Sequence, residues 1–195
     1  MKKSIPISNH FCPQTLFIYG TYKEDGTPNF GLFCWFSYYF DREMGVMACI
    51  GGNKLTRDRI HETRVFSANL VTEELLPLAD YFGNIEGYSE GKMRVPVETE
   101  KGRLLNVPVL AKSPWVFELE VDRSLPLEGG EVLLCKIRNV LAEELLCDET
   151  LSLEKRMETV RPVHSIRQSY FRWDGTEFGP WGEPMQRVLN DLKGR

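Results

Sequence analysis

The residues with the clearest capacity for chemistry lie in one short segment, residues 52–60 (GNKLTRDRI). A predicted strand ends in a Gly-Gly turn there, and a predicted helix follows with Lys54, Thr56 and two arginines around its first turn. Free backbone N–H groups at a helix N-terminus favour an anion, and a lysine and a hydroxyl beside them would complete a phosphate site. The alternative is an ordinary helix start that Thr56 caps. The segment alone leaves both interpretations open.

A second segment with chemical potential is the aromatic run at residues 29–39 (NFGLFCWFSYY). A large, flat, mostly apolar ring with one polar edge needs apolar walls and a few hydrogen-bonding groups. Asn29, Trp35 and Ser37 could supply them. The alternative is a core strand of a barrel, whose aromatic side chains pack only against one another.

Several common catalytic and binding motifs are missing. The chain has no GxGxxG and no GxSxG, and the glycine-rich stretch at residues 87–93 is one residue shorter than a P-loop and ends in Met93 instead of Ser or Thr. The three histidines do not have metal-ligand spacing, so we expect no metal site. No triad is recognisable, and we assign no catalytic side chain.

Composition limits the classes of partner. The chain has 195 residues, 42% of them hydrophobic, and a net charge of −4, which predicts a single domain over residues 1–195 and no nucleic-acid partner. One phosphate in a local basic pocket remains compatible with this charge. We expect no membrane span, because no apolar run approaches about 18 residues, and no secretory signal. Five widely spaced cysteines predict free thiols and a cytoplasmic location.

The elements that must position these residues are mainly strands. Six or so short strands, with helices confined to insertions and the C-terminal end, predict an antiparallel β-barrel with added helices. Residues 84–114 are predicted as a long excursion with at most one short strand. A terminal amphipathic helix at about 184–193 needs a partner surface. The predicted strands are residues 15–22, 29–40 (as one long strand or two short ones), 45–50, 65–71, 115–121 and 132–143, and the predicted internal helices are 55–64 and 77–83.

A series of weak motifs follows one another in a specific order between about residues 12 and 140. Together they resemble the flavin reductase-like, FMN-binding split-barrel family, on its flavoredoxin-like branch. The motifs are Cys12-Pro13, Asp25-Gly26-Thr27-Pro28-Asn29, Trp35-Phe36-Ser37, Asn53-Lys54-Leu55-Thr56 with Ile60, Phe66-Ser67-Ala68-Asn69-Leu70, Ala79-Asp80-Tyr81-Phe82-Gly83, and Gly87-Tyr88-Ser89-Glu90-Gly91-Lys92.

This resemblance implies a six-stranded antiparallel split barrel with Greek-key connections that binds FMN non-covalently. It also implies a homodimer with the cofactor near the subunit interface. By position, Asn29 and Trp35 would face the flavin ring and Ser37 would lie nearby, whereas Lys54 and Thr56 would hold the phosphate or ribityl chain. The full set of cofactor-binding residues that we expect is Asn29, Trp35, Ser37, Asn53, Lys54, Thr56 and Lys92. We expect Lys92 to lie exposed in its glycine-rich loop, so that its replacement leaves the fold unchanged.

The function that the resemblance implies is an FMN-dependent oxidoreductase, which takes electrons from NAD(P)H or a redox partner protein and passes them on. One phosphate-sized basic cluster without a glycine-rich pyrophosphate loop favours FMN over FAD. Many relatives carry a histidine where this chain has Glu131, and a carboxylate cannot donate as an imidazolium can. Two alternatives stay open: an FMN electron carrier without NAD(P)H activity of its own, and a non-enzymatic barrel that binds another ligand or a protein.

Overall fold

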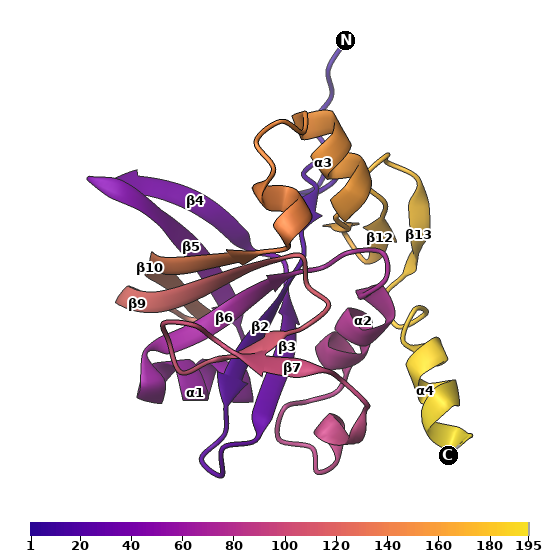
Figure 1. Cartoon of the computed structure of the whole chain (residues 1–195). Coiled ribbons are helices and arrows are strands. Elements are labelled where there is room, and N and C mark those ends of the chain that lie inside the picture. Colours follow the sequence, from indigo (N-terminus) through magenta and orange to yellow (C-terminus); the bar gives the residue numbers. More distant parts are fainter. Residues whose placement is uncertain (195) are drawn as a thin grey trace.

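Alternating apolar residues and turn signals produce a seven-stranded antiparallel sheet with the strand order β3-β2-β6-β9-β10-β5-β4 (Figure 1). The computed structural model describes residues 1–194. The strands of this sheet are β2 (Phe17–Tyr22), β3 (Pro28–Phe33), β4 (Phe36–Asp41), β5 (Glu43–Gly51), β6 (Val65–Leu70), β9 (Trp115–Leu127) and β10 (Gly130–Ala142). The α-helices are α1 (Leu55–Thr63), α2 (Leu76–Asn84), α3 (Leu153–Val160) and α4 (Gln186–Lys193).

The sheet curls into a split barrel because its two edge strands are neighbours in sequence. β3 ends at Phe33 and β4 begins at Phe36, so the two residues between them hold the edges together at one corner. The aromatic run forms two strands, and the sheet therefore has seven strands where the resemblance implied six. β5 and β6 follow each other through α1, yet β9 and β10 lie between them, as in a Greek-key connection. The mainly-β, antiparallel fold class is confirmed.

The barrel interior is a continuous apolar core. Strand pairing directs Tyr19, Val46 and Ala48 inward, and all three are fully buried. α1 closes one end: Ile60 joins this core, and the Arg59 guanidinium donates to the Tyr22 carbonyl at 2.9 Å. The long β9–β10 hairpin has two register shifts, which allow it to bend around the core.

A second apolar cluster lies outside the barrel, between α2 and the outer faces of β2 and β3. The apolar face of α4, including Val188, Leu189 and Leu192, packs against this cluster. The terminal helix therefore folds back onto its own chain instead of leaving its apolar face open.

The long excursion contains more structure than we predicted. It forms a short 3-10 helix, η1 (Lys92–Arg94), and a two-stranded ribbon of β7 (Thr99–Lys101) and β8 (Pro108–Leu110). The prediction of at most one strand was wrong, because the ribbon is anchored by tertiary contacts that local sequence does not show: Ser67 Oγ donates to the Pro108 carbonyl, and Asn69 Oδ1 accepts from the Leu110 amide.

The remaining strands form a separate four-stranded sheet with the order β1-β11-β12-β13. A second 3-10 helix, η2, lies between β10 and α3. The bounds are β1 (Gln14–Thr15), η2 (Glu144–Cys147), β11 (His164–Ile166), β12 (Ser169–Phe171) and β13 (Glu177–Pro180). Within residues 1–194, no helix has the length and apolar character needed to cross a membrane.

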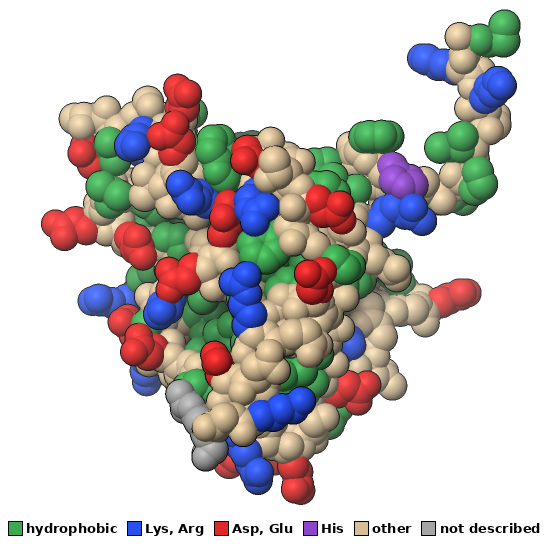
Figure 2. All heavy atoms as spheres, turned by 90° about the vertical axis from the view of Figure 1, so that its right-hand side faces the viewer, with side chains coloured by type: hydrophobic (Ala, Val, Ile, Leu, Met, Phe, Trp, Pro, Cys, Tyr) green, Lys and Arg blue, Asp and Glu red, His purple; other side chains and the backbone are tan. Residues whose placement is uncertain are grey.

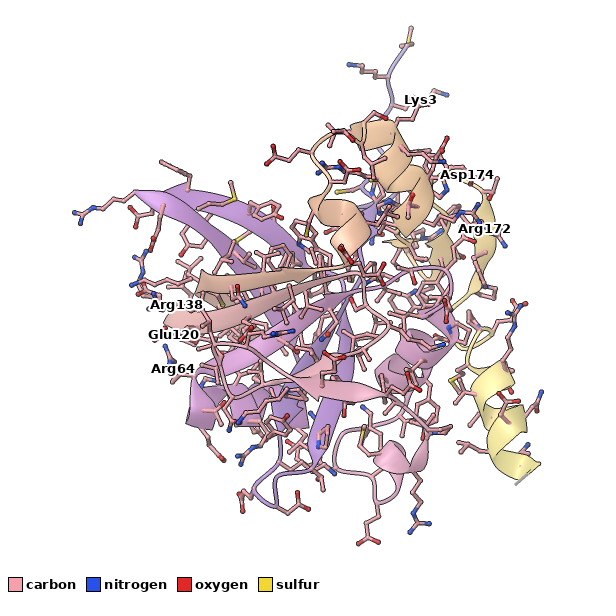
Figure 3. All side chains as sticks on the ribbon, viewed as in Figure 1. Lys3, Arg64, Glu120, Arg138, Arg172 and Asp174 are labelled. Atoms are coloured by element: carbon pink, nitrogen blue, oxygen red, sulfur yellow. The ribbon has the colours of Figure 1, made fainter. Side chains whose placement is uncertain are left out.

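Charged side chains of both signs are interspersed on the outer surface. Figure 2 shows acidic and basic groups mixed on one face, with the N-terminal segment extending away from the body. Figure 3 places Arg64, Glu120 and Arg138 near one another on the left-hand side of the view, where Arg138 of β10 and Glu120 of β9 form an ion pair.

Candidate functional site

Asn29 lies at the barrel end that α1 closes. β3 carries its side chain inward, where it is fully buried. Its Nδ2 donates to Thr21 Oγ1 at 3.2 Å and to Thr56 Oγ1 at 3.0 Å. Its Oδ1 is buried and has no hydrogen-bond partner. A buried acceptor without a partner costs about 1–3 kcal/mol, so this atom marks a position where a ligand donor would be stabilising.

The first turn of α1 begins without a side-chain cap. Lys54 is the N-cap residue, in an extended conformation, and no side-chain hydrogen bond caps the helix. Thr56 does not fill this role, because its hydroxyl lies inside the helix's first turn and accepts from Asn29. The interpretation of Thr56 as a helix cap is therefore wrong. The first backbone N–H groups of α1 remain available to an anion.

The loop that follows α2 lies close against this helix start. A Cβ atom added to Gly87 would lie 2.7 Å from Leu55 Cβ and 3.2 Å from Asn29 Oδ1, and one added to Gly31 would lie 3.0 Å from Thr56 Oγ1. Tyr88, in the same loop, donates its hydroxyl hydrogen bond to Asp58 of α1. Glycines at these positions thus allow β3, α1 and the loop to approach closely, and we call this junction the cradle.

Three lysines surround the cradle. Lys92 is only 4% exposed, and its Nζ donates to the Phe82 carbonyl at 2.9 Å. Burial and, to a smaller extent, the positive charges of Lys54 and Lys23 together lower the pKa of Lys92 to about 8. We expected Lys92 on an exposed loop, where its replacement would leave the fold unchanged. That expectation was wrong, because η1 turns this side chain inward against α2.

The remaining expected site residues lie farther from Asn29. Asn53 is exposed, and its Oδ1 accepts from Arg57 Nη2 at 3.1 Å. Trp35 is 56% exposed, and its ring lies 4.0 Å from where a Gly51 Cβ would be, next to the strand that leads into α1. Ser37 is exposed on β4 and lines a different hollow, with Phe17. The structure therefore brings Asn29 and Thr56 into contact with each other. Lys54 and Lys92 lie near this pair, whereas Ser37 lies at another part of the barrel.

Sequence reasoning missed Thr21, Lys23, Gly31 and Gly87. A usable signal existed for Thr21, because the Asp25-Gly26 turn sets the hairpin register that pairs Thr21 with Asn29. No comparable local signal existed for Gly31 or Gly87, whose role depends on how close α1 comes to them.

Glu131 is held by neighbours on the other side of α1. Its carboxylate is almost fully buried, accepts a hydrogen bond from Ser124, and lies 2.7 Å from His61 Nε2. Arg57 Nε is 3.9 Å away. A negative charge, and not a histidine, thus occupies this side of the helix start.

A split antiparallel barrel with an uncapped, lysine-surrounded helix start defines a class of β-barrel suited to a phosphate-bearing ligand. Residues 9–158 match the family model described as the flavin reductase like domain. This match spans more than half of the chain, and the chain belongs to that family. No curated protein matches the chain.

Solved structures share the fold at low sequence identity. Flavoredoxin of Desulfovibrio vulgaris (Miyazaki F) is 22% identical, with a TM-score of 0.75 over 88% of this chain and 93% of that one. An FMN-binding protein from Thermus thermophilus is 20% identical, with a TM-score of 0.70 over 88% and 93%. Nitrilotriacetate monooxygenase component B from Bacillus cereus is 13% identical, with a TM-score of 0.75 over 88% and 95%.

Proposed function

We propose that this protein is an FMN-binding oxidoreductase of the flavin reductase type. It takes electrons from NAD(P)H or a redox partner protein and passes them on. The observation that carries the proposal is the buried, unpaired Oδ1 of Asn29 beside the uncapped start of α1. Family membership and the names of similar structures, a flavoredoxin and an FMN-binding protein, support the same conclusion.

The residues of the cradle fit a flavin mononucleotide. Free N–H groups of α1 and the Lys54 ammonium suit a phosphate dianion. Lys92 has three N–H donors and uses one of them on the Phe82 carbonyl, so two remain for a ligand. Its ammonium is buried near the positive charges of Lys54 and Lys23, and a nearby anion would stabilise its charged form. Asn29 and Thr56 would hold the ribityl chain or the polar edge of the ring, with Trp35 and Asn53 at the rim. Ser37 lines the separate hollow at the other end of the barrel and is not part of this proposed site. Bound FMN would supply the redox chemistry itself.

FMN is favoured over FAD because the cradle offers one phosphate position. FAD requires a second phosphate and room for an adenosine, which is usually held by a glycine-rich pyrophosphate loop. Chromatography of the flavin released by denaturation tests this point. FMN is the expected product, and FAD as the sole bound flavin would contradict the proposal.

The second candidate function is an electron carrier that does not react with NAD(P)H. The Glu131 carboxylate favours it, because it stands where a histidine could donate to a nicotinamide nucleotide, and a carboxylate cannot donate. Steady-state oxidation of NADH and NADPH by the FMN-loaded protein separates the two functions. Turnover with either nucleotide supports the oxidoreductase. Reduction by dithionite without nucleotide turnover supports the carrier.

We further propose that the protein is a homodimer and that all its residues form one domain. Paired positions on β5, β9 and β10 direct Met47, Leu125 and Leu127 to the same outer face of the sheet, and the Trp35 ring lies over Gly51 on that face. All four side chains are exposed, and we call them the outer patch. A second copy covering it would lie next to the start of α1, which places the cofactor near the subunit interface.

A further inference from the structure

The barrel has one closed end and one open end. α1 closes the first, where Asn29 and Thr56 meet. At the opposite end, a hollow of about 410 Å³ opens between β4 on one side of the split and β2 and β9 on the other, and we call this hollow the mouth. The mouths of β-barrels are a common place for small-molecule sites, and this volume is within the usual range of about 300–1,000 Å³.

The walls of the mouth are aromatic on both sides of the split. Phe17 of β2 and Phe36 of β4 stack with their ring centroids 4.1 Å apart. Tyr38 and Trp115 each meet Phe117 edge-on, with centroids 6.2 and 6.1 Å apart. Ring faces and edges arranged in this way complement another aromatic ring better than they complement an aliphatic chain.

The residues that line the mouth include no carboxylate, ammonium or guanidinium group to receive a charged ligand. Their polar groups are hydroxyls and the indole N–H of Trp115, and Thr15 Oγ1 lies 3.3 Å from His164 Nδ1 at the rim. Moving an unpaired charge into such surroundings is costly. An uncharged ring with one hydrogen-bonding oxygen matches this lining, and a phosphate-bearing nucleotide does not.

The mouth is also separate from the proposed cofactor site. Phe17, in its wall, lies four residues along β2 from Thr21, which contacts Asn29. At 3.3 Å per strand residue this is a separation of about 13 Å. The core side chains Tyr19 and Phe66 fill the space between the two ends of the barrel.

We propose that the open mouth of the barrel binds a neutral, planar aromatic molecule of one or two rings. The probe is 2-naphthol, which is uncharged at pH 7, titrated calorimetrically into the FMN-loaded and the flavin-free protein. Saturable binding of one equivalent is expected in both forms, because the mouth does not share residues with the Asn29 cradle. The charged analogue 2-naphthoate is expected to bind at least tenfold more weakly.

Two substitutions on the same strand provide the matched comparison. Tyr38→Ala removes part of the wall, whereas Phe40→Ala removes a more exposed ring two residues along β4 that does not line the mouth. We expect Tyr38→Ala to weaken 2-naphthol binding at least fivefold and Phe40→Ala to change it less than twofold. Trp115→Leu is a second wall variant with the same expected loss, should Tyr38→Ala not fold.

Three results would overturn the proposal. The first is an absence of saturable 2-naphthol binding, and the second is an equal effect of Tyr38→Ala and Phe40→Ala. The third is binding that weakens as protein concentration rises or as FMN is added, because the mouth would then be covered by a second copy or shared with the cofactor.

Discussion

Asn29 connects three parts of the molecule through one amide group. Its nitrogen joins β2 and α1 through Thr21 and Thr56, and its unpaired oxygen faces the Gly87 loop. An asparagine suits this position because it offers donors and an acceptor on one short side chain. The amide therefore fixes the helix start on the barrel and leaves one buried acceptor unpaired, which the proposed ligand would use.

Lys92 predicts a pH-dependent affinity for FMN. Its pKa of about 8 is below the usual 10.5, because burial and two neighbouring lysines disfavour the charged form. A phosphate attracts the protonated lysine, so FMN binding should weaken as pH rises through 8, by about tenfold between pH 7 and 9. Calorimetric titration with FMN measures this slope, and riboflavin, which has no phosphate, should not show it.

Lys92→Met is the matched variant, because it keeps the apolar stem and removes the titrating group. Its FMN affinity should be lower at pH 7 and almost independent of pH to pH 9; an unchanged slope would assign the titration to another group.

The lowered pKa of Lys92 also makes the free energy of unfolding depend on pH. Between about pH 8 and 10.5 the folded, flavin-free protein binds fewer protons than the unfolded chain, so Lys92 contributes stability that rises with pH in this window.

At the residue scale, the sequence singled out Asn29 and Thr56, which lie in hydrogen-bond contact, but it did not predict their surroundings. The pairing of Asn29 with Thr56 joins residues that are far apart in the chain, and only the resemblance brought them together beforehand. The prediction that Thr56 caps the helix was wrong, because its hydroxyl accepts a hydrogen bond from Asn29 on β3 instead. The prediction that Lys92 is exposed was wrong, because a glycine-rich loop gives no local sign that η1 turns this side chain inward.

At the scale of elements, α2 organises the C-terminal part of the chain through Asp80. This fully buried carboxylate accepts hydrogen bonds from the Tyr170 hydroxyl, the Asn84 amide and the backbone N–H groups of Gly182 and Met185. α2, the strand β12 and the turn that leads into α4 thus meet at one side chain. The sequence predicted α2 and α4, but neither α3 nor this junction, since a lone Asp in a helix does not indicate its partners.

Asp80→Asn tests this junction. One acceptor oxygen becomes a donor facing other donors, so at least one buried N–H or O–H loses its partner, at a cost of about 1–3 kcal/mol. Hydrogen exchange should accelerate in residues 180–193, and the thermal midpoint should fall. Asp191→Asn, on the exposed face of α4, should change neither. Unchanged exchange in Asp80→Asn would mean that apolar packing alone holds α4.

At the scale of the whole molecule, the hydrophobic pattern was sufficient for the fold class. Regular alternation and turn signals predicted an antiparallel barrel, because one face of each strand must be buried. The count of strands depended on whether the aromatic run bends at Cys34 and Trp35, which alternation alone does not determine. The large apolar side chains of the outer patch stay exposed in the single chain, a pattern that marks an interaction surface.

The outer patch predicts a dimer in solution. Light scattering should give about twice the chain mass of 22.5 kDa at micromolar concentration. Met47→Glu places a charge in the patch, and the desolvation of this charge should shift the protein to the monomer. Leu153→Glu, an equally polar change on exposed α3, should remain dimeric. A parent protein of 22.5 kDa, or a dimeric Met47→Glu variant, would contradict this surface.

The central claim is that the start of α1 and its lysines hold the phosphate of FMN. The most direct measurement compares dissociation constants for FMN and riboflavin in the parent, in Lys54→Ala and in Lys155→Ala, a control on exposed α3. A hydrogen bond to a charged group contributes about 1.5–3 kcal/mol, so Lys54→Ala should bind FMN about 10- to 100-fold more weakly. Riboflavin affinity should change less than twofold, and Lys155→Ala should match the parent. If Lys54→Ala binds FMN as tightly as the parent, or if the parent binds riboflavin as tightly as FMN, the phosphate does not lie at the start of α1.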